Sequence, residues 1–174
     1  MAKFSWNLPT SNGTVIAVNG QLLIAQEITA QLSADFTISS AVATPIGNLN
    51  VEIIDNEGKY NSTATTNSFT VSSSGVYQVI LNIQLSQTAS SNPVVGVWDD
   101  TTADWIVRGN DLYTATEVNG SNLRRQTYTM ITSVDMDSTH TRRAAAGIAC
   151  TVKAFSAGAT GSGAISQVTL KRLK

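Results

Sequence analysis

The stretch Val76-Tyr77-Gln78-Val79-Ile80-Leu81-Asn82-Ile83-Gln84-Leu85 decides the fold class, because apolar side chains occupy every odd position from Tyr77 to Leu85. Side chains two residues apart in a β-strand point to the same face of the sheet, so this alternation predicts a strand with one buried face. Burial of each large apolar side chain contributes roughly 1.5–3 kcal/mol. We therefore expect the five odd-numbered residues to lie in the core.

The same alternation recurs at 128–136, where Tyr128, Met130, Val134 and Met136 are expected to point inward. In the segment 147–154 the pattern places Ile148, Cys150 and Val152 on one face. The other expected strands, all short and bounded by turn residues, cover 35–40, 49–54, 67–72, 93–98, 104–108 and 164–173. About ten short strands at this spacing, with no long helical pattern after residue 35, indicate an all-β sandwich.

Residues 1–33 differ in character and are interpreted as an N-terminal arm that precedes a sandwich domain at 34–174. Asn19-Gly20 separates two apolar runs and favours a two-residue hairpin, because both residues accept the positive φ angles of a type I′ turn. The alternative is a short helix over 21–33, where Leu, Ala, Gln and Glu are strong helix formers. The sequence leaves both conformations open.

Composition excludes several classes of function. The chain has 174 residues with 11 Lys+Arg against 12 Asp+Glu, a formal net charge of −1, so no global field attracts nucleic acid or an anionic membrane. No apolar run is long enough for a transmembrane helix or a secretory signal, so we expect a protein that is made in a cytoplasm and is either kept there or packaged from it. With one cysteine and one histidine, a Cys/His zinc site is excluded. We expect no cofactor and no metal.

His140 is the one imidazole, and Asp135, Asp137 and Ser138 lie near it in the sequence. These residue types can form a nucleophilic triad, but a triad is assembled from separate segments, and a Gly-x-Ser-x-Gly elbow is absent. Asp, Ser, Thr and His are also what a tight strand connection contains. We therefore expect a turn here, no catalytic residue, and no enzyme.

The turn after residue 98 is the candidate ligand loop. Trp98 and Trp105 flank it and offer a stacking platform for a sugar, and Asp99 and Asp100 supply carboxylates. With Asp104 and Asp111 these carboxylates are also the ligand type of Ca²⁺, although the EF-hand spacing is absent and turn aspartates are the favoured interpretation. The pairs Arg124-Arg125 and Arg142-Arg143 are interpreted as solvated strand ends, and Cys150 as an inert core side chain.

Phe69, Gly75 and Tyr77 stand in the order Phe, short stretch, Gly, one residue, Tyr, followed by the alternating strand. This pattern resembles the globular domain of the complement C1q and tumour necrosis factor superfamily, and the segment 165–170 is similar to its last strand. The resemblance covers about residues 35–174. It implies a ten-stranded jelly roll, assembly as a homotrimer, and an N-terminal stalk or attachment segment.

If the odd residues of 76–85 are buried, the opposite face of that strand and of 128–136 is polar and nearly uncharged. One interpretation is a solvated face, which antiparallel sheets often have. The other is a trimer interface, because few charges would need desolvation there. The interface candidates are Gln78, Ile80, Asn82, Thr129, Ile131 and Ser133.

These observations favour a non-enzymatic structural protein. We expect a trimeric virion component, such as a bacteriophage capsid-decoration or head-fibre protein, that attaches to a capsid or fibre protein through residues 1–33. Its expected location is the virion surface, after assembly in the host cytoplasm. The alternative is a receptor- or carbohydrate-binding module of a phage or spore-surface fibre, with a surface glycan as its partner.

Overall fold

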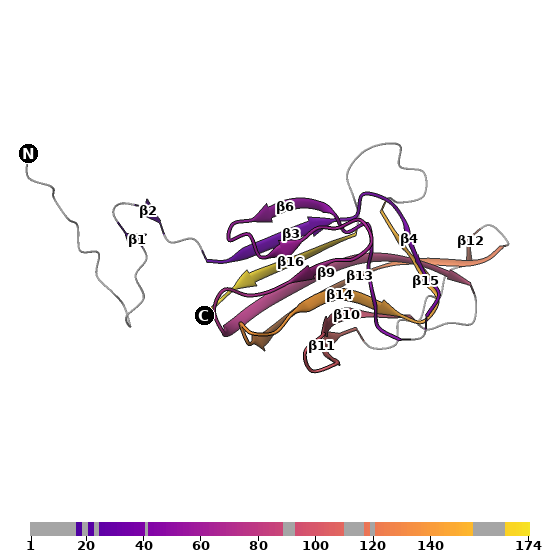
Figure 1. Ribbon diagram of the computed structural model, residues 1–174. Helices are drawn as coiled ribbons and strands as arrows, with labels where there is room; N and C mark the ends of the chain where they lie inside the picture. The colour runs from indigo at the N-terminus through magenta and orange to yellow at the C-terminus, as the bar shows by residue number, and fades with distance from the viewer. Residues whose placement is uncertain are drawn as a thin grey trace, which may run out of the picture.

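The computed structural model describes residues 17–18, 21–22, 25–40, 42–88, 93–109, 117–118, 121–154 and 166–174. Within these residues every regular element is a β-strand, and two antiparallel sheets share one hydrophobic core (Figure 1). The chain crosses repeatedly between the sheets, as in a jelly roll: β9 lies in the large sheet, β10 and β11 in the small one, β12 and β13 in the large one and β14 in the small one. The all-β sandwich expected from the sequence is confirmed.

The large sheet is built around two long strands, β9 (Gly75–Thr88) and β13 (Ser121–Met136), which pair along their whole shared length. Its other strands are β16 (Gln167–Arg172), β3 (Glu27–Gln31), β6 (Val51–Asp55), β12 (Glu117–Val118), β15 (Cys150–Lys153) and β4 (Phe36–Ile38). The order is β12-β13-β9-β16-β3-β6, and β15 pairs with both β9 and β4. In the described part of the chain, β6 is therefore an edge strand.

The small sheet is centred on β14 (Arg142–Gly147), and the remaining members are β10 (Val94–Asp99), β11 (Asp104–Arg108), β8 (Ser68–Phe69), β7 (Tyr60–Asn61) and β5 (Thr44–Pro45). The sequence interpretation of Arg142 as a solvated strand end is wrong. Arg142 is buried and lies opposite Asp99 of β10 in the strand register. An ion-paired arginine can occupy a core position that the hydropathy pattern assigns to the surface.

At the N-terminus, β1 (Ala17–Val18) pairs with β2 (Gln21–Leu22) and Val18 lies opposite Gln21, which is the register of the expected hairpin. The remaining residues of 1–24 lie outside the described part of the chain. The alternative helix over 21–33 is wrong, because β3 is a strand between β16 and β6. Alternate residues Ile28, Ala30 and Leu32 are buried, so the sandwich includes residues that the sequence analysis assigned to the arm.

The inward alternation of β9 is confirmed, since all five odd-numbered residues from Tyr77 to Leu85 are at most 2% exposed. Across the sheet Met136 is buried, and Tyr128, Met130 and Val134 pack against the same core. These two strands supply a large share of the apolar surface that drives folding.

The segment before β15 departs from its expected alternation. Ile148 lies in a bend with a φ angle of 66°, so it does not share a strand face with Cys150 and Val152. Cys150 and Val152 are buried as expected. Burial raises the pKa of the Cys150 thiol to about 11, which keeps it protonated and unreactive near neutral pH.

Phe69, Gly75 and Tyr77 meet at one end of the sandwich. Phe69 is buried and lies opposite both Tyr60 and Arg142. A Cβ atom on Gly75 would overlap the backbone carbonyl of Lys174, so the close approach of the C-terminal residue requires glycine. The Tyr77 hydroxyl lies 2.9 Å from the Ser73 carbonyl and 3.1 Å from Gln26 Oε1, and it thereby joins three segments.

Candidate functional site

The six residues expected at an interface form one compact patch on the outer face of the large sheet. In the register of β9 and β13, Gln78 lies opposite Ser133, Ile80 opposite Ile131, and Asn82 opposite Thr129. Directly opposite residues of an antiparallel pair share a face, so the patch consists of three cross-strand rows with the two isoleucines in the middle. The Ile131 side chain is 62% exposed in the single chain.

Polar rows continue this patch across two further strands. Thr169 of β16 lies opposite Ile80, and its hydroxyl is 3.0 Å from the hydroxyl of Thr29 in β3. In the next row Gln31 Nε2 donates to Gln167 Oε1 over 3.1 Å. Amides and hydroxyls therefore bond to one another along the sheet, which lowers the cost of covering them.

Charge is sparse on this face. Lys171 Nζ of β16 lies 3.4 Å from Glu27 Oε2 of β3, so these two charges offset each other. Asp135 of β13 is exposed near the end of the strand, outside the three rows. A second protein surface can cover the three rows without leaving an unpaired charge buried.

Sequence reasoning missed an apolar group beside this face. Val51, Ile53 and Ile54 of β6 are 39%, 53% and 36% exposed, and β6 is an edge strand. Val51 lies opposite Gln31 and Ile54 opposite Thr29, so both extend the polar rows to the sheet margin. The sequence analysis predicted a strand at 49–54, but the sequence holds no signal for its edge position.

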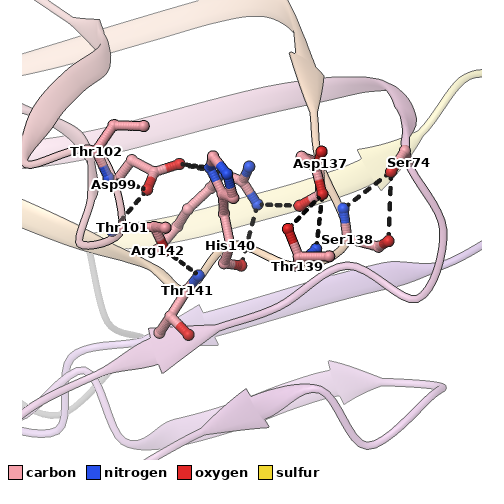
Figure 2. Close-up of polar contacts among 10 residues, drawn as sticks. All are labelled: Ser74, Asp99, Thr101, Thr102, Asp137, Ser138, Thr139, His140, Thr141 and Arg142. Atoms are coloured by element: carbon pink, nitrogen blue, oxygen red, sulfur yellow. Dashed lines mark hydrogen bonds and ion pairs between the residues drawn. The ribbon is translucent and has the colours of Figure 1, made fainter.

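His140 of the 137–141 turn forms a cluster with Asp99 of β10 and Arg142 of β14 (Figure 2); Asp99 and Arg142 are buried, and His140 is partly exposed. Asp99 Oδ2 lies 2.8 Å from His140 Nδ1 and 3.1 Å from Arg142 Nε, the latter as an ion pair and not as an aligned hydrogen bond. Asp99 Oδ1 accepts hydrogen bonds from the backbone N–H groups of Thr101 and Thr102. We call these three side chains, Asp99, His140 and Arg142, the Asp99 cluster.

Several interactions act on the Asp99 carboxyl in opposite directions. Burial alone raises its pKa, but the hydrogen bonds from His140, Thr102 and Thr101, together with the Arg142 charge, outweigh burial and hold the pKa below its ordinary value of 3.8. Arg142 in turn donates from one terminal nitrogen to the carbonyl oxygens of Asp137 and His140. The cluster therefore fixes the turn to both strands.

The Asp99 cluster does not form the triad considered from the sequence. The carboxylate beside His140 comes from Asp99, while Asp137 accepts hydrogen bonds from Thr139. Ser138 and Ser74 are hydrogen-bonded to each other, and no serine or threonine hydroxyl among the described residues is bonded to His140.

The two aspartates of the candidate ligand loop differ in burial. Asp99 is buried and its oxygens are occupied, whereas Asp100 is partly exposed and forms an ion pair with Arg143. Trp98 and Trp105 lie opposite each other on β10 and β11, with ring centroids 5.4 Å apart at 83°. This edge-to-face pair stays partly exposed on the outer face of the small sheet.

The described residues contain no group of three His, Cys, Asp or Glu side chains placed to hold a metal ion. The carboxylates considered for Ca²⁺ have other partners: Asp99 and Asp100 bind the groups given above, and Asp104 accepts from the backbone N–H of Trp105. Asp111 lies outside the described residues. Nor does any helix able to cross a membrane occur in the described ranges.

No family model matches the chain, and no curated protein matches it. Among solved structures, the chain is similar to the one described as "Structure of Eiger TNF from S. frugiperda". The sequence identity is 16% and the TM-score 0.39, over 87% of this chain and 92% of that chain. The strand pairing given above is what defines this protein as a β-sandwich with jelly-roll connections.

Proposed function

We propose that the protein is a non-enzymatic structural component that assembles as a homotrimer through the outer face of β9 and β13. The observation that carries this proposal is the placement of Ile80 and Ile131 as cross-strand neighbours inside a polar face with almost no net charge. An exposed isoleucine of this kind gains from burial, and the amides and hydroxyls around it tolerate burial when they are hydrogen-bonded. Three copies meeting around one axis would bury both isoleucines.

The mass in solution tests the trimer. Size-exclusion chromatography with light scattering is expected to give three times the chain mass of 18.4 kDa at micromolar concentration. Ile131→Lys is expected to yield monomers, because a threefold axis brings three lysine charges together in one buried place. Val42→Lys is the matched control, since Val42 is another exposed apolar residue, on the loop before β5. A monomeric native protein, or a trimeric Ile131→Lys variant, would contradict the proposal.

We further propose that the trimer belongs to a virion, as a capsid-decoration or head-fibre protein, and that the N-terminal arm attaches it. The support is the sequence pattern of an arm that precedes a sandwich with a sparsely charged surface. The structure changes how this is tested, because deletion of 1–33 would remove β3. Deletion of 1–24 leaves Gln26 and β3 intact, and it should abolish co-sedimentation with virions made from the encoding genome while the trimer persists. Undiminished co-sedimentation would refute attachment through the arm.

A receptor- or carbohydrate-binding role is the second candidate, and the partly exposed Trp98–Trp105 pair favours it. This pair lies on the small sheet, away from the patch of β9 and β13, so a binding role is compatible with the trimer. A glycan array probed with the native protein, Trp98→Ala and Trp105→Ala separates the roles. Binding that is lost in both variants supports the second candidate, and no binding by the native protein removes it.

A further inference from the structure

Three side chains form a row across the outer face of the small sheet. Its strands lie in the order β11-β10-β14, and the register places Trp98 between Trp105 on one side and Arg143 on the other. Asp99 and Arg142, their neighbours along β10 and β14, are opposite each other and buried. Because side chains alternate along a strand, Trp98 and Arg143 point outward. The row therefore places a guanidinium group beside an aromatic pair at the surface.

Asp100 adds a carboxylate to this row. It follows Trp98 by two positions in the sequence, and Arg143 Nε donates to Asp100 Oδ2 over 2.8 Å. Both side chains of this ion pair are partly exposed, Arg143 by 27% and Asp100 by 24%. Within the described ranges, no group is bonded to Asp100 Oδ1 or to Arg143 Nη1. One acceptor and one donor thus remain for a ligand next to the aromatic pair.

The turn that carries Asp100 is held from inside the protein. The Asp100 N–H donates to the Thr141 carbonyl over 2.9 Å. The N–H groups of the next two residues, Thr101 and Thr102, donate to the buried Asp99 carboxylate (Figure 2). A ligand that meets a group already held in position loses less conformational entropy on binding. The position of the Asp100 carboxylate near Trp98 is therefore set before a ligand arrives.

An aromatic pair with a neighbouring donor and acceptor matches the chemistry of a pyranose sugar. A pyranose ring has an apolar C–H face that can pack on an aromatic ring, and each of its hydroxyl groups can both donate and accept a hydrogen bond. The opposite charges of Asp100 and Arg143 offset each other, so the pair has no net charge with which to attract an anion. An acidic group on the sugar would approach Asp100 as closely as Arg143, and the like charge of Asp100 opposes this.

We propose that this row binds a neutral hexopyranose, with the C–H face of the sugar against the Trp98–Trp105 pair and two adjacent hydroxyl groups bonded to Asp100 Oδ1 and the Arg143 guanidinium. This inference rests on the second candidate function, glycan binding, and adds the class of sugar and its polar contacts. The row lies on the small sheet, so it does not depend on the proposed trimer patch of β9 and β13.

A glycan array probed with the full-length protein tests the class of sugar. The array carries neutral hexose oligosaccharides (lactose, cellobiose and mannobiose) beside acidic ones (sialyllactose and an oligogalacturonate). Binding confined to neutral members is expected. A preference for the acidic members would overturn the class of sugar and leave glycan binding in place. Absence of binding to every neutral member would overturn the site.

Two variants test the polar contacts by titration with the neutral glycan that binds most tightly. Asp100→Asn and Arg143→Gln are each expected to weaken binding about three- to tenfold, because each disturbs one hydrogen bond to a hydroxyl group. Asp100→Asn also leaves Arg143 without its counterion, so it should reduce the preference for neutral over acidic glycans. Asp35→Asn is the matched control, since Asp35 belongs to another partly exposed ion pair, with Lys153, and precedes β4 of the large sheet. Its affinity should equal that of the native protein.

The variants separate this inference from the candidate function on which it rests. If binding is lost in Trp98→Ala but unchanged in Asp100→Asn or Arg143→Gln, the contact with that polar side chain is overturned while glycan binding through the tryptophans stands. If Asp35→Asn weakens binding as much as Asp100→Asn, the effect is not specific to this row and the assignment of Asp100 is overturned.

Discussion

The two ends of β9 differ in how their buried polar groups are satisfied. At the Gly75 end, the Tyr77 hydroxyl has two acceptors within reach, and the Asp99 carboxylate accepts hydrogen bonds from the 101–102 backbone and pairs with His140. Further along β9, Ile83 lies opposite Tyr128, whose buried hydroxyl has no hydrogen-bond partner among the described residues. Hydrogen bonds and ion pairs connect the polar side chains at the first end, whereas the Tyr128 hydroxyl at the second is buried without a hydrogen bond. We therefore expect removal of a polar group to cost more stability at the first end than at the second.

The largest effect should come from removing the centre of the network. Asp99→Ala leaves Arg142 buried without its counterion, which is expected to lower the free energy of unfolding by about 3–5 kcal/mol. Urea denaturation measures this difference. Asp100→Ala is the matched control, because its pair with Arg143 is partly exposed, and it should cost less than about 1 kcal/mol. Equal losses of unfolding free energy in Asp99→Ala and Asp100→Ala would show that the buried ion pair stabilises the protein no more than the partly exposed one.

Gly75→Ala should have the next largest effect. The new methyl group meets the Lys174 carbonyl and forces the C-terminal residue away from β9, at an expected cost of about 1–3 kcal/mol. Val76 N–H donates to the same carbonyl over 3.0 Å, and that bond would be strained as well. In a chain that ends at Leu173 the substitution should cost much less. If Gly75→Ala lowers the free energy of unfolding as much in the shortened chain as in the full chain, the contact with the Lys174 carbonyl is not the cause.

The two tyrosines give the most direct comparison of the two ends. Tyr77→Phe removes a bonded hydroxyl and should destabilise the protein by about 1 kcal/mol. Tyr128→Phe removes an unbonded buried hydroxyl, so its stability should equal or exceed that of the native protein. Thermal unfolding of both variants, measured in parallel with the native protein, compares the two changes in stability. A loss for Tyr128→Phe as large as for Tyr77→Phe would mean that the two ends do not differ.

Acid should destabilise the protein mainly through the Asp99 cluster at the Gly75 end of β9. The pKa of Asp99 in the folded protein lies below 3.8, so its contribution to stability is present above that pH and is lost as the pH falls through the folded value. Unfolding free energies measured from pH 6 to pH 2 should therefore decline less steeply in Asp99→Asn than in the native protein. Parallel declines would assign the acid sensitivity to other carboxyls.

Local alternation was sufficient to predict the all-β sandwich. The apolar residues from Tyr77 to Leu85 recur every second position, which is the period of a β-strand with one buried face. The same alternation predicted that Ile80 and Ile131 lie on the outer face of the sheet, before the pairing register of their strands was known. It failed for β3, where Gln, Glu and Ala favour a helix in isolation. Pairing with β16 and β6 overrides that preference, since strand propensity depends on tertiary context.

The Asp99 cluster was beyond sequence reasoning for a different reason. Asp99 and His140 are 41 positions apart, and no local spacing connects them. Arg142 was assigned to the surface because isolated charges seldom enter a core, and only the opposing carboxylate of β10 makes its burial favourable.

The bare margin of β6 has a practical consequence for handling the protein. No described strand pairs with the outer side of β6, which also carries the exposed Val51, Ile53 and Ile54, and such an edge templates the addition of further extended chains. Concentrated preparations should form ordered aggregates from this margin first. A lysine introduced into β6 is the simplest means of keeping stocks dispersed.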